Sequence, residues 1–267
     1  NYRWGRTAMA SVEYNVTSSR DTRGEEPAAE AETNVSLKPL ISVIIPVFNE
    51  VTWVADIVRQ VRDAPFPMEI IIVDDGSTDG TGHVLDTLAE SDTVILRHDR
   101  NQGKGAALRT ALAHINGNIV LVQDADLEYD PADYARLIQP LIRGRADVVY
   151  GSRFLHSDSR LVLNFWHCLA NRLVTVLSNA FTGLNLSDME TCYKVFNRDV
   201  IDMLKPTLKE SGFGIEPELT AKIARGNYKI YEVAVRYRGR TARQGKKLRC
   251  RDALRACWCI ARYWWKD

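Results

Sequence analysis

The stretch NIVLVQDAD, residues 118–126, decides the fold of this chain. An unbroken apolar run such as Val120-Leu121-Val122 is typical of a strand that is covered on both faces. Similar runs lie on either side of it, and stretches of helical length separate them. The runs are ISVIIPVF (41–48), EIIIVDD (69–75), TVILRHD (93–99) and ADVVYGSRF (146–154), and the separating stretches are 50–63, 79–90, 104–116 and 131–143. This alternation predicts an α/β fold with a mostly parallel sheet flanked by helices.

The two ends of the chain differ in composition from its middle. Residues 1–38 are rich in Ser, Glu, Ala and Thr with little apolar periodicity, which predicts a disordered leader. Residues 39–240 carry the strand and helix pattern, and residues 241–267 form a basic segment. Further elements of the middle part are a helix over 161–182, a helix near 214–225 and a strand over 228–237. We expect one α/β domain between a leader and a C-terminal helical segment.

Composition narrows the class of protein. The chain has 267 residues, 45% hydrophobic and 26% charged, and its formal net charge of +1 argues against a nucleic-acid binder. The five cysteines are odd in number and lack C-x-x-C spacing, so we expect reduced thiols rather than a zinc site. No run of 18 apolar residues and no signal peptide are visible, which predicts a cytoplasmic protein without a membrane span.

Carboxylates follow the strand at 118–126 in an alternating pattern. Asp124, Asp126 and Glu128 would point the same way on an extended chain. Three negative charges at that spacing repel one another unless a cation neutralises them, and oxygen ligands suit Mg²⁺ or Mn²⁺. The alternative is a solvated acidic loop that begins a helix at Pro131 with Asp130 as its N-cap.

Two other motifs allow both a structural and a functional interpretation. In VDDGSTDGTG (73–82), helix capping explains the Ser and the later Asp but not Asp74, which ends a buried strand and needs a partner such as a nucleotide base or ribose hydroxyl. In NQGKGAALRTAL (101–112), a helix begins at Gly103-Lys104-Gly105, where free backbone N–H groups attract anions. The spacing is not that of a Walker loop, and the chain has no strand–Gly-x-Gly-x-x-Gly–helix unit, so a nicotinamide dehydrogenase is disfavoured.

Taken in order, these motifs resemble a known family. SVIIPVFNE, IIIVDDGSTDGT, RNQGKGAALRTAL, VQDADLEYDPADY and VVYGSRF are similar to family 2 inverting glycosyltransferases of the Rossmann-like GT-A fold. The closest branch includes dolichyl-phosphate mannose synthase and bacterial polyprenyl-phosphate glucosyltransferases, and the resemblance runs from about residue 40 to the C-terminus. It implies transfer of mannose or glucose from a nucleotide-diphosphate sugar, such as GDP-mannose or UDP-glucose, to dolichyl or undecaprenyl phosphate.

The resemblance also implies roles for individual residues. The residues implied to bind the donor nucleotide sugar are Pro46, Phe48, Glu50, Asp74, Asp75, Lys104 and Asp124. Those implied to hold Mg²⁺ or Mn²⁺ are Asp124, Asp126 and Glu128, although some relatives have Gln at the last position. The implied catalytic residues are Asp126, Arg153, Asp188, Lys194 and Arg240. The arginines and the lysine of that set match positions that face the acceptor phosphate or donor diphosphate, with surface ion pairs as the alternative.

The C-terminal segment has the composition of a membrane-interface helix. Eleven Lys or Arg residues lie between Arg236 and Lys266. On a helix over about 249–265, tryptophans and other apolar residues recur at spacings of three and four beside a stripe of arginines. The alternative is that this apolar stripe packs on the domain. The helix can bind the membrane and pack on the domain at the same time if it docks at the rim of the site. The helix at 161–181 is a second candidate, so we expect peripheral binding to a membrane surface.

Three other functions remain open on the sequence. A transferase of the same fold could act on a polysaccharide or another glycan acceptor, and a catalytically inactive membrane adaptor would share the same surface features. A sugar nucleotidyltransferase is disfavoured because PVFNE (46–50) stands where its Gly-rich loop would be. The sequence does not separate GDP-mannose from UDP-glucose, and it does not define an oligomeric state.

Overall fold

The computed structural model describes residues 40–155, 162, 164–240 and 250–266, with side chains in the last helix described from residue 255 to 265. The expected leader over 1–38 and the basic residues 241–249 lie outside the described residues.

A seven-stranded mixed sheet forms the centre of the domain. The strands are β1 (Ile41–Val47), β2 (Met68–Asp74), β3 (Thr93–Arg97), β4 (Ile119–Val122), β5 (Val148–Ser152), β6 (Lys194–Asn197) and β7 (Ile230–Ala234). Their order is β3-β2-β1-β4-β6-β5-β7, and β6 is antiparallel to both of its neighbours while all other pairs are parallel. The predicted mostly parallel sheet is confirmed. The insertion of an antiparallel strand between β4 and β5 was not predicted.

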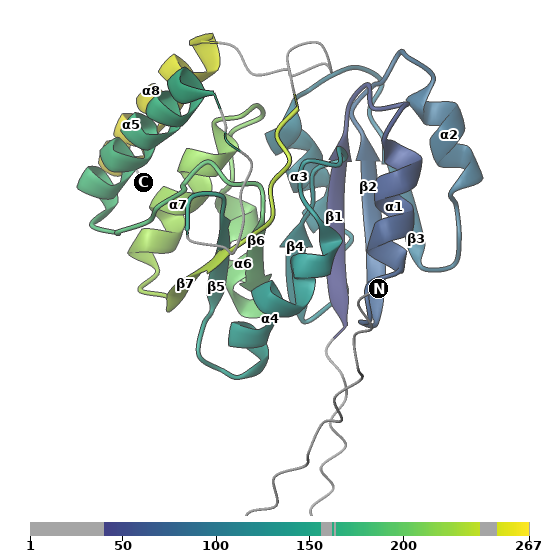
Figure 1. Cartoon of the computed structure of the whole chain (residues 1–267), viewed down its shortest axis with the longest axis horizontal. Helices are drawn as coiled ribbons and strands as arrows, with labels where there is room; N and C mark the ends of the chain where they lie inside the picture. Colours follow the sequence, from purple (N-terminus) through teal and green to yellow (C-terminus); the bar gives the residue numbers. More distant parts are fainter. Residues whose placement is uncertain (1–39, 156–161, 163, 241–249, 267) are drawn as a thin grey trace, which may run out of the picture. The chain divides into compact units, whose positions relative to one another are not determined.

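Helices flank this sheet, as the sequence predicts (Figure 1). They are α1 (Val54–Arg62), α2 (Thr81–Thr87), α3 (Lys104–Leu112), α4 (Tyr134–Ile142), α5 (Phe165–Thr182), α6 (Arg198–Leu204), α7 (Ile215–Arg225) and α8 (Cys250–Lys266), with 3₁₀ turns η1 (Pro131–Asp133) and η2 (Lys205–Thr207). The four crossover helices, α5, α7 and α8 match the predicted stretches, whereas α6 and η2 were not predicted. Helices α5 and α8 lie side by side at the upper left of Figure 1.

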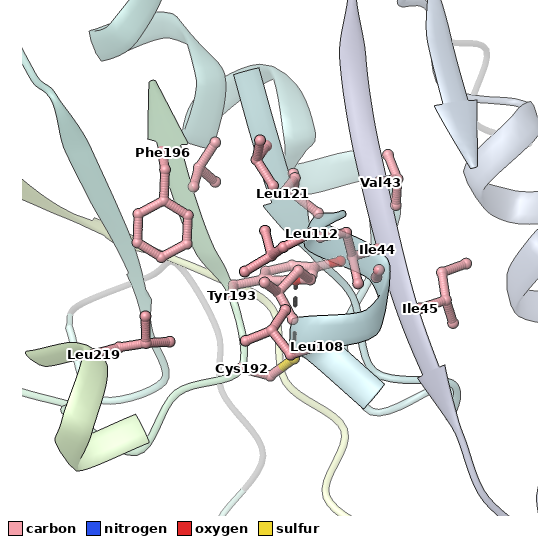
Figure 2. Close-up of a cluster of buried hydrophobic side chains, with 14 of the residues drawn as sticks. Val43, Ile44, Ile45, Leu108, Leu112, Leu121, Cys192, Tyr193, Phe196 and Leu219 are labelled. Atoms are coloured by element: carbon pink, nitrogen blue, oxygen red, sulfur yellow. Dashed lines mark hydrogen bonds between the residues drawn. The ribbon is translucent and has the colours of Figure 1, made fainter. Parts of the chain in front are cut away.

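The core explains why the apolar runs are continuous. Val43, Ile44 and Ile45 of β1 are all fully buried, although neighbouring side chains point to opposite faces of the sheet. Helices therefore cover both faces. Figure 2 shows Leu108 and Leu112 of α3 in the same cluster of buried side chains as Val43, Ile44, Leu121, Tyr193 and Phe196 of the sheet region. Burial on both faces leaves the edge of the sheet, not a face, as the place where polar side chains can gather.

The strand directions bring distant segments of the chain to one edge. In parallel strands the carboxyl ends coincide, so β1, β2, β4, β5 and β7 all end at this edge. Because β6 runs in the opposite direction, it begins there, and its first residue Lys194 pairs with Tyr150 of β5. The segments that follow these five strands and the loop that precedes β6 consequently lie at the same edge of the sheet.

Among the helices in the part of the chain that the structure describes, none is long and apolar enough to cross a membrane.

Candidate active site

The loops after β1 and β2 are cross-linked by side-chain hydrogen bonds. Asn49 adopts a left-handed backbone conformation with φ of 52°, and its side-chain oxygen accepts a hydrogen bond from the backbone of Thr78 at 2.8 Å. The backbone N–H of Glu50 donates to Thr81 Oγ1 at 3.0 Å. Asp74, at the end of β2, accepts from the backbone of Ser77 at 3.0 Å and is 5% exposed. A hydrogen bond within the turn, rather than helix capping, therefore occupies one oxygen of Asp74, and these bonds hold both loops at the sheet edge.

Asp75 fixes the start of α3. Its carboxylate accepts hydrogen bonds from the backbone of Gln102 at 2.8 Å and of Gly103 at 2.7 Å, and it contacts His98 Nδ1 at 2.7 Å. Gly103 has φ of +99°, a conformation that side chains rarely adopt. In this structure Asp75 thus supports the loop that places Lys104, the first residue of α3.

Lys104 connects the segment after β4 to helix α7. Its ammonium group lies 2.9 Å from Asp124 Oδ1 and 3.1 Å from Glu216 Oε1. Burial opposes both charges, but the attraction between them raises the pKa of Lys104 and lowers the pKa of Asp124. Glu216 also binds Lys194, which is 1% exposed and donates to the backbone carbonyls of Met189 and Thr191. The two lysines and two acids form one buried chain of charges, which we call the Lys104 chain.

Arg240 gathers three acids from two segments that are far apart in the sequence. Its guanidinium lies 2.6 Å from Asp126 Oδ2 and 3.0 Å from Glu50 Oε2, and its backbone N–H donates to Glu128 Oε1 at 2.6 Å. Tyr237 donates its hydroxyl hydrogen to the other oxygen of Glu128 at 2.6 Å. The segment after β7 therefore folds over the segment after β4, and we call these residues the Arg240 cluster.

The Arg240 cluster still carries an excess of negative charge. Burial raises the pKa of Asp126 to about 7, and the neighbouring Asp124 and Glu128 add to that effect while Arg240 opposes it. A single arginine thus does not fully compensate the three carboxylates. A divalent cation at this position would stabilise the ionised form of Asp126.

The residues present fit a divalent cation by chemistry and charge. Asp124, Asp126 and Glu128 offer the oxygen donors that Mg²⁺ and Mn²⁺ prefer. Their side chains are engaged with Lys104, Arg240 and each other's backbone, and the described residues contain no group of three His, Cys, Asp or Glu side chains already arranged around one point. Binding of a cation would therefore require Arg240 to move off Asp126.

Arg153, which follows β5, is held by a buried acid. Its Nε donates to Asp188 Oδ2 at 2.7 Å, and its Nη2 donates to Asp188 Oδ1 at 2.7 Å. Its backbone N–H donates to the same carboxylate at 3.0 Å. The guanidinium carbon also lies 5.2 Å from the centre of the Tyr237 ring. Asp188 is fully buried, so its charge fixes the arginine in one position and raises its pKa despite burial.

A pocket of about 350 Å³ opens beside these groups. Its polar wall contains Lys104, Asp124, Glu128, Arg153, Glu190 and Glu216. Its other walls are formed by Tyr129, Trp166, His167, Ala170, Asn171, Val174, Cys192, Phe213, Tyr237 and Ala256. Cations, acids and aromatic rings thus surround one space at the sheet edge, a composition typical of a small-molecule site.

The sequence-predicted residues occupy three positions relative to this pocket. Lys104, Asp124, Glu128 and Arg153 line it. Asp126, Asp188, Lys194, Arg240 and Glu50 contact lining residues or belong to the same ion-pair clusters. Pro46, Phe48, Asp74 and Asp75 lie in or beside the loops after β1 and β2, outside the pocket lining. The roles inferred for all of them remain predictions.

Three residues of the site were not singled out from the sequence. Glu216 completes the Lys104 chain, Tyr237 binds Glu128, and Glu190 lines the pocket. Glu190 lies in DMETCYKVF (188–196), between two residues that the motif did indicate, so its position offered a signal. Tyr237 lies 109 residues from its partner Glu128, and Glu216 lies 22 residues from Lys194 and still farther from Lys104, and no local pattern predicts such pairings.

Helix α8 packs on the domain near the pocket. Ala256, Cys259, Ile260 and Tyr263 are buried, and the Tyr263 hydroxyl donates to Glu210 at 3.0 Å. The opposite side exposes Trp258, Trp264 and Trp265, the last of them 82% exposed. Packing on the domain, one of the two predicted alternatives, is confirmed. The exposed tryptophans leave the other alternative compatible with it.

Helix α5 also exposes apolar side chains next to the pocket. Phe165 and Trp166 are 67% and 72% exposed, and Leu173 and Val176 continue the apolar surface along the helix. Trp166 additionally lines the pocket. The mouth of the site therefore lies beside an exposed apolar surface, which we define by these four residues and call the α5 surface.

Comparison with solved structures supports the fold. A glucosyl-3-phosphoglycerate synthase from Mycobacterium tuberculosis in complex with uridine-diphosphate superimposes with a TM-score of 0.65 over 85% of this chain and 80% of that chain, at 20% sequence identity. A complex of the same enzyme with Mn²⁺, uridine-diphosphate-glucose and phosphoglyceric acid gives a TM-score of 0.63 over 84% and 78% of the two chains. At this level of identity the likeness establishes the GT-A architecture.

Comparison with characterised sequences gives more specific relatives. Glycosyltransferase AglJ of Haloferax volcanii is 31% identical over 74% of this chain and 62% of its own length. A dolichyl-phosphate beta-glucosyltransferase of Trichomonas vaginalis is 29% identical over 79% and 72%, respectively. An undecaprenyl-phosphate 4-deoxy-4-formamido-L-arabinose transferase of Pseudomonas aeruginosa is 30% identical over 65% of this chain and 52% of its own. The chain thus spans between about half and three quarters of the length of these relatives.

The family profile described as Glycosyl transferase family 2 matches residues 42–204, which include β1 to β6, the Lys104 chain up to Lys194 and the Arg153–Asp188 pair. With this match and the GT-A fold, the chain belongs to glycosyltransferase family 2.

Proposed function

We propose that this chain transfers a hexose, mannose or glucose, from a nucleotide-diphosphate sugar to a polyprenyl phosphate at the cytoplasmic membrane face. The observation that carries the proposal is the buried Arg153, which Asp188 holds in one position on the wall of the pocket that also contains Lys104 and Asp124. The names of the Trichomonas and Pseudomonas relatives, which include dolichyl phosphate and undecaprenyl phosphate, support the same class of acceptor.

The donor side of the site is the part between β1 and β4. We assign the nucleoside to the residues at and after the ends of β1 and β2, which are Pro46, Phe48, Glu50, Asp74 and Asp75. Lys104 lies where it can attract the diphosphate, since it begins α3 and lines the pocket. We assign Asp124, Asp126 and Glu128 to the divalent cation. When bound, Mg²⁺ or Mn²⁺ would stabilise the negative charge of the leaving nucleoside diphosphate.

The acceptor side is the part around Arg153. In the transfer, the bond between the anomeric carbon and the donor diphosphate breaks, and a phosphate oxygen of the acceptor forms the new bond to that carbon. The acceptor phosphate is already anionic, so it needs no base to remove a proton, and a fixed guanidinium can orient it. Arg240 and Lys194 do not line the pocket, whereas Arg153 does. Arg240 neutralises acids of the donor side, and Lys194 reaches the pocket through Glu216.

The membrane part of the proposal rests on exposed aromatic residues. The α5 surface and the three tryptophans of α8 lie on neighbouring helices, and Trp166 reaches both the exterior and the pocket. Tryptophan at such a position favours the boundary between lipid and water. We therefore propose that residues 39–240 form the catalytic domain, that 241–267 help to bind the membrane surface, and that a lipid acceptor enters beside α5.

The first experiment measures transfer of labelled sugar to a short polyprenyl phosphate. Separate reactions contain GDP-mannose or UDP-glucose with Mn²⁺, and EDTA serves as the control. Metal-dependent formation of a glycolipid from one donor supports the reaction class and identifies the sugar. A bound nucleotide sugar without glycolipid formation would point to another acceptor, such as a glycan, and failure of the pocket to bind any nucleotide would favour an inactive adaptor.

Asp126→Ala tests the assignment of the cation. Loss of this carboxylate is expected to reduce transfer by at least about 100-fold under saturating Mn²⁺, because the negative charge of the leaving group is then less stabilised. Equal turnover of this variant and the parent enzyme would contradict the assignment. Circular dichroism and thermal unfolding confirm that the variant is folded.

A further inference from the structure

Glu190 differs from the other acids around the pocket because one of its two carboxylate oxygens has no hydrogen-bond partner among the described residues. That oxygen, Oε1, is buried. Two residues earlier, Asp188 accepts three hydrogen bonds from Arg153, and Glu216 is bound by both lysines of the Lys104 chain. Within one small region, two acids are thus fully engaged and one is not.

Within the described part of the chain, the cations nearest to Glu190 are already paired with other acids. Lys194 and Arg153 are near enough to favour its ionised form, but Lys194 is already bound to Glu216 and Arg153 to Asp188. Those same two acids repel the charge of Glu190. A buried acceptor without a donor destabilises the folded state, and such exceptions in a folded protein call for an explanation.

Asp133 provides an instructive comparison. It too is buried and has one carboxylate oxygen without a hydrogen-bond partner. That oxygen, however, has the guanidinium groups of Arg136 and Arg236 at 3.9 and 3.8 Å, and its other oxygen accepts from the backbone of Arg236 at 2.6 Å. Asp133 is outside the pocket lining, whereas Glu190 is part of it. A ligand in the pocket can therefore reach the second acid but not the first.

The position of Glu190 limits what such a ligand can present to it. A phosphate oxygen is excluded at this point because two anionic groups would repel each other. The nucleoside is also disfavoured, since the loops with Asp74 and Asp75 are outside the pocket lining. What remains is an uncharged group that donates a hydrogen bond. Trp166 and Phe213 also line the pocket, and they supply apolar surface of the kind that covers the C–H face of a sugar ring.

We propose that the Glu190 carboxylate accepts a hydrogen bond from a hydroxyl group of the sugar being transferred, and that it is a specificity-determining residue for that sugar. The inference rests on the proposed function, because it assumes a nucleotide-sugar donor. Beyond the proposed function, the inference states which part of the donor is recognised, the sugar, and which residue recognises it, Glu190. The partner missing from the protein is supplied by the substrate, so correct binding removes the unsatisfied acceptor.

The test compares binding of whole and truncated donors by titration calorimetry in the presence of Mn²⁺. The ligands are UDP-glucose, GDP-mannose, their singly deoxygenated analogues at the 2-, 3-, 4- and 6-positions, and UDP and GDP alone. The proteins are the parent enzyme, Glu190→Ala, the nearly isosteric Glu190→Gln and the matched control Asp133→Asn. Thermal unfolding of every variant shows whether it is folded, and Glu190→Gln serves if the alanine variant is not.

Glu190→Ala is expected to weaken binding of the preferred nucleotide sugar about 10- to 100-fold, the effect of losing a hydrogen bond to a charged group, and to leave binding of the nucleoside diphosphate unchanged. One deoxy analogue should bind the parent enzyme correspondingly more weakly but should lose little further affinity in the variant. Asp133→Asn should retain the discrimination of the parent enzyme.

Two results would overturn the inference. Equal weakening of nucleotide sugar and nucleoside diphosphate by Glu190→Ala would show a general disturbance of the pocket. Unchanged discrimination among the deoxy analogues in a folded Glu190→Ala or Glu190→Gln variant would show that another residue reads the sugar. Failure of the parent enzyme to bind any nucleotide sugar would refute the proposed function itself, an outcome that is distinct from both.

Discussion

Replacing Glu190 by Gln should make this protein more stable at neutral and alkaline pH. Burial raises the pKa of Glu190 to about 7 from its ordinary value of 4.5, and Glu216 contributes to the increase. Between those two values the folded state binds more protons than the unfolded state. The unfolding free energy contributed by this group therefore decreases as pH rises from about 4.5 to 7. Glutamine cannot ionise, so the variant lacks that decrease.

The size of the effect follows from the interval between the two pKa values. An interval of about 2.5 pH units at about 1.4 kcal/mol per unit corresponds to about 3 kcal/mol in total. Because part of it is already lost at pH 5, the change from pH 5 to pH 8 is about 2.5 kcal/mol. For a chain of this size that corresponds to about 5–10 °C in Tm. The difference in Tm between Glu190→Gln and the parent protein should therefore increase by about 5–10 °C, in favour of the variant, from pH 5 to pH 8.

Differential scanning calorimetry at pH 5, 6, 7 and 8 measures this difference directly. Glu90→Gln makes the same chemical change at an exposed position, 60% accessible to solvent, and serves as the control. Parallel Tm curves for Glu190→Gln and the parent protein across this range would refute the reasoning, because they would mean that the carboxylate ionises in the folded state without cost. A ligand that donates to Glu190 should reduce the difference between the two proteins at pH 8.

Three further predictions concern other contacts of the site. Asp188→Asn leaves the buried Arg153 without its counter-ion and should lower the free energy of unfolding by about 3–5 kcal/mol in urea titrations; a loss below about 1 kcal/mol would show that the pair is not a main support. Gly103→Ala adds a Cβ that overlaps a backbone carbonyl at a φ of +99°, and it should lower Tm clearly, whereas Gly212→Ala, which has no atom within 4 Å of the added carbon, should not. Arg240→Ala removes the cation that neutralises the acids after β4, so Mn²⁺ binding measured by calorimetry without nucleotide should tighten at least about tenfold, and unchanged binding would argue against competition between the arginine and a metal.

Much of the sheet could be predicted from the sequence because its strands are buried on both faces. The runs at 41–48, 69–75 and 118–126 each contain an unbroken stretch of at least three apolar residues, and the helices between the strands have lengths that fit crossover connections. Strand β6 could not be placed in the same way. It has four residues, Lys194–Asn197, and its position between β4 and β5 depends on pairing across more than 40 residues of chain.

The sequence predicted those parts of the site in which a charged side chain follows a strand. Asp124 and Arg153 follow strands, and both line the pocket. The ion pairs between them and other segments were not predictable. Glu50 and Arg240 are 190 residues apart, and only the fold of the last strand and the segment after it brings the two charges together. Lys194 was expected to face a phosphate, but the backbone carbonyls around it and Glu216 surround its ammonium group, a result of β6 beginning at the crowded sheet edge.

The reversed direction of β6 brings the chain back to the sheet edge at which the neighbouring strands end. Strands β1 to β4 set the geometry of one side of the pocket through mutual pairing. The segment that leads into β6 approaches this edge from the opposite direction; its Asp188 is fully buried and bound to Arg153, whereas its Glu190 lines the pocket. A change of the side chain at position 190 thus alters the wall of the pocket while the pairing of the first four strands stays in place, which is a route by which new substrate preferences can arise on the same sheet.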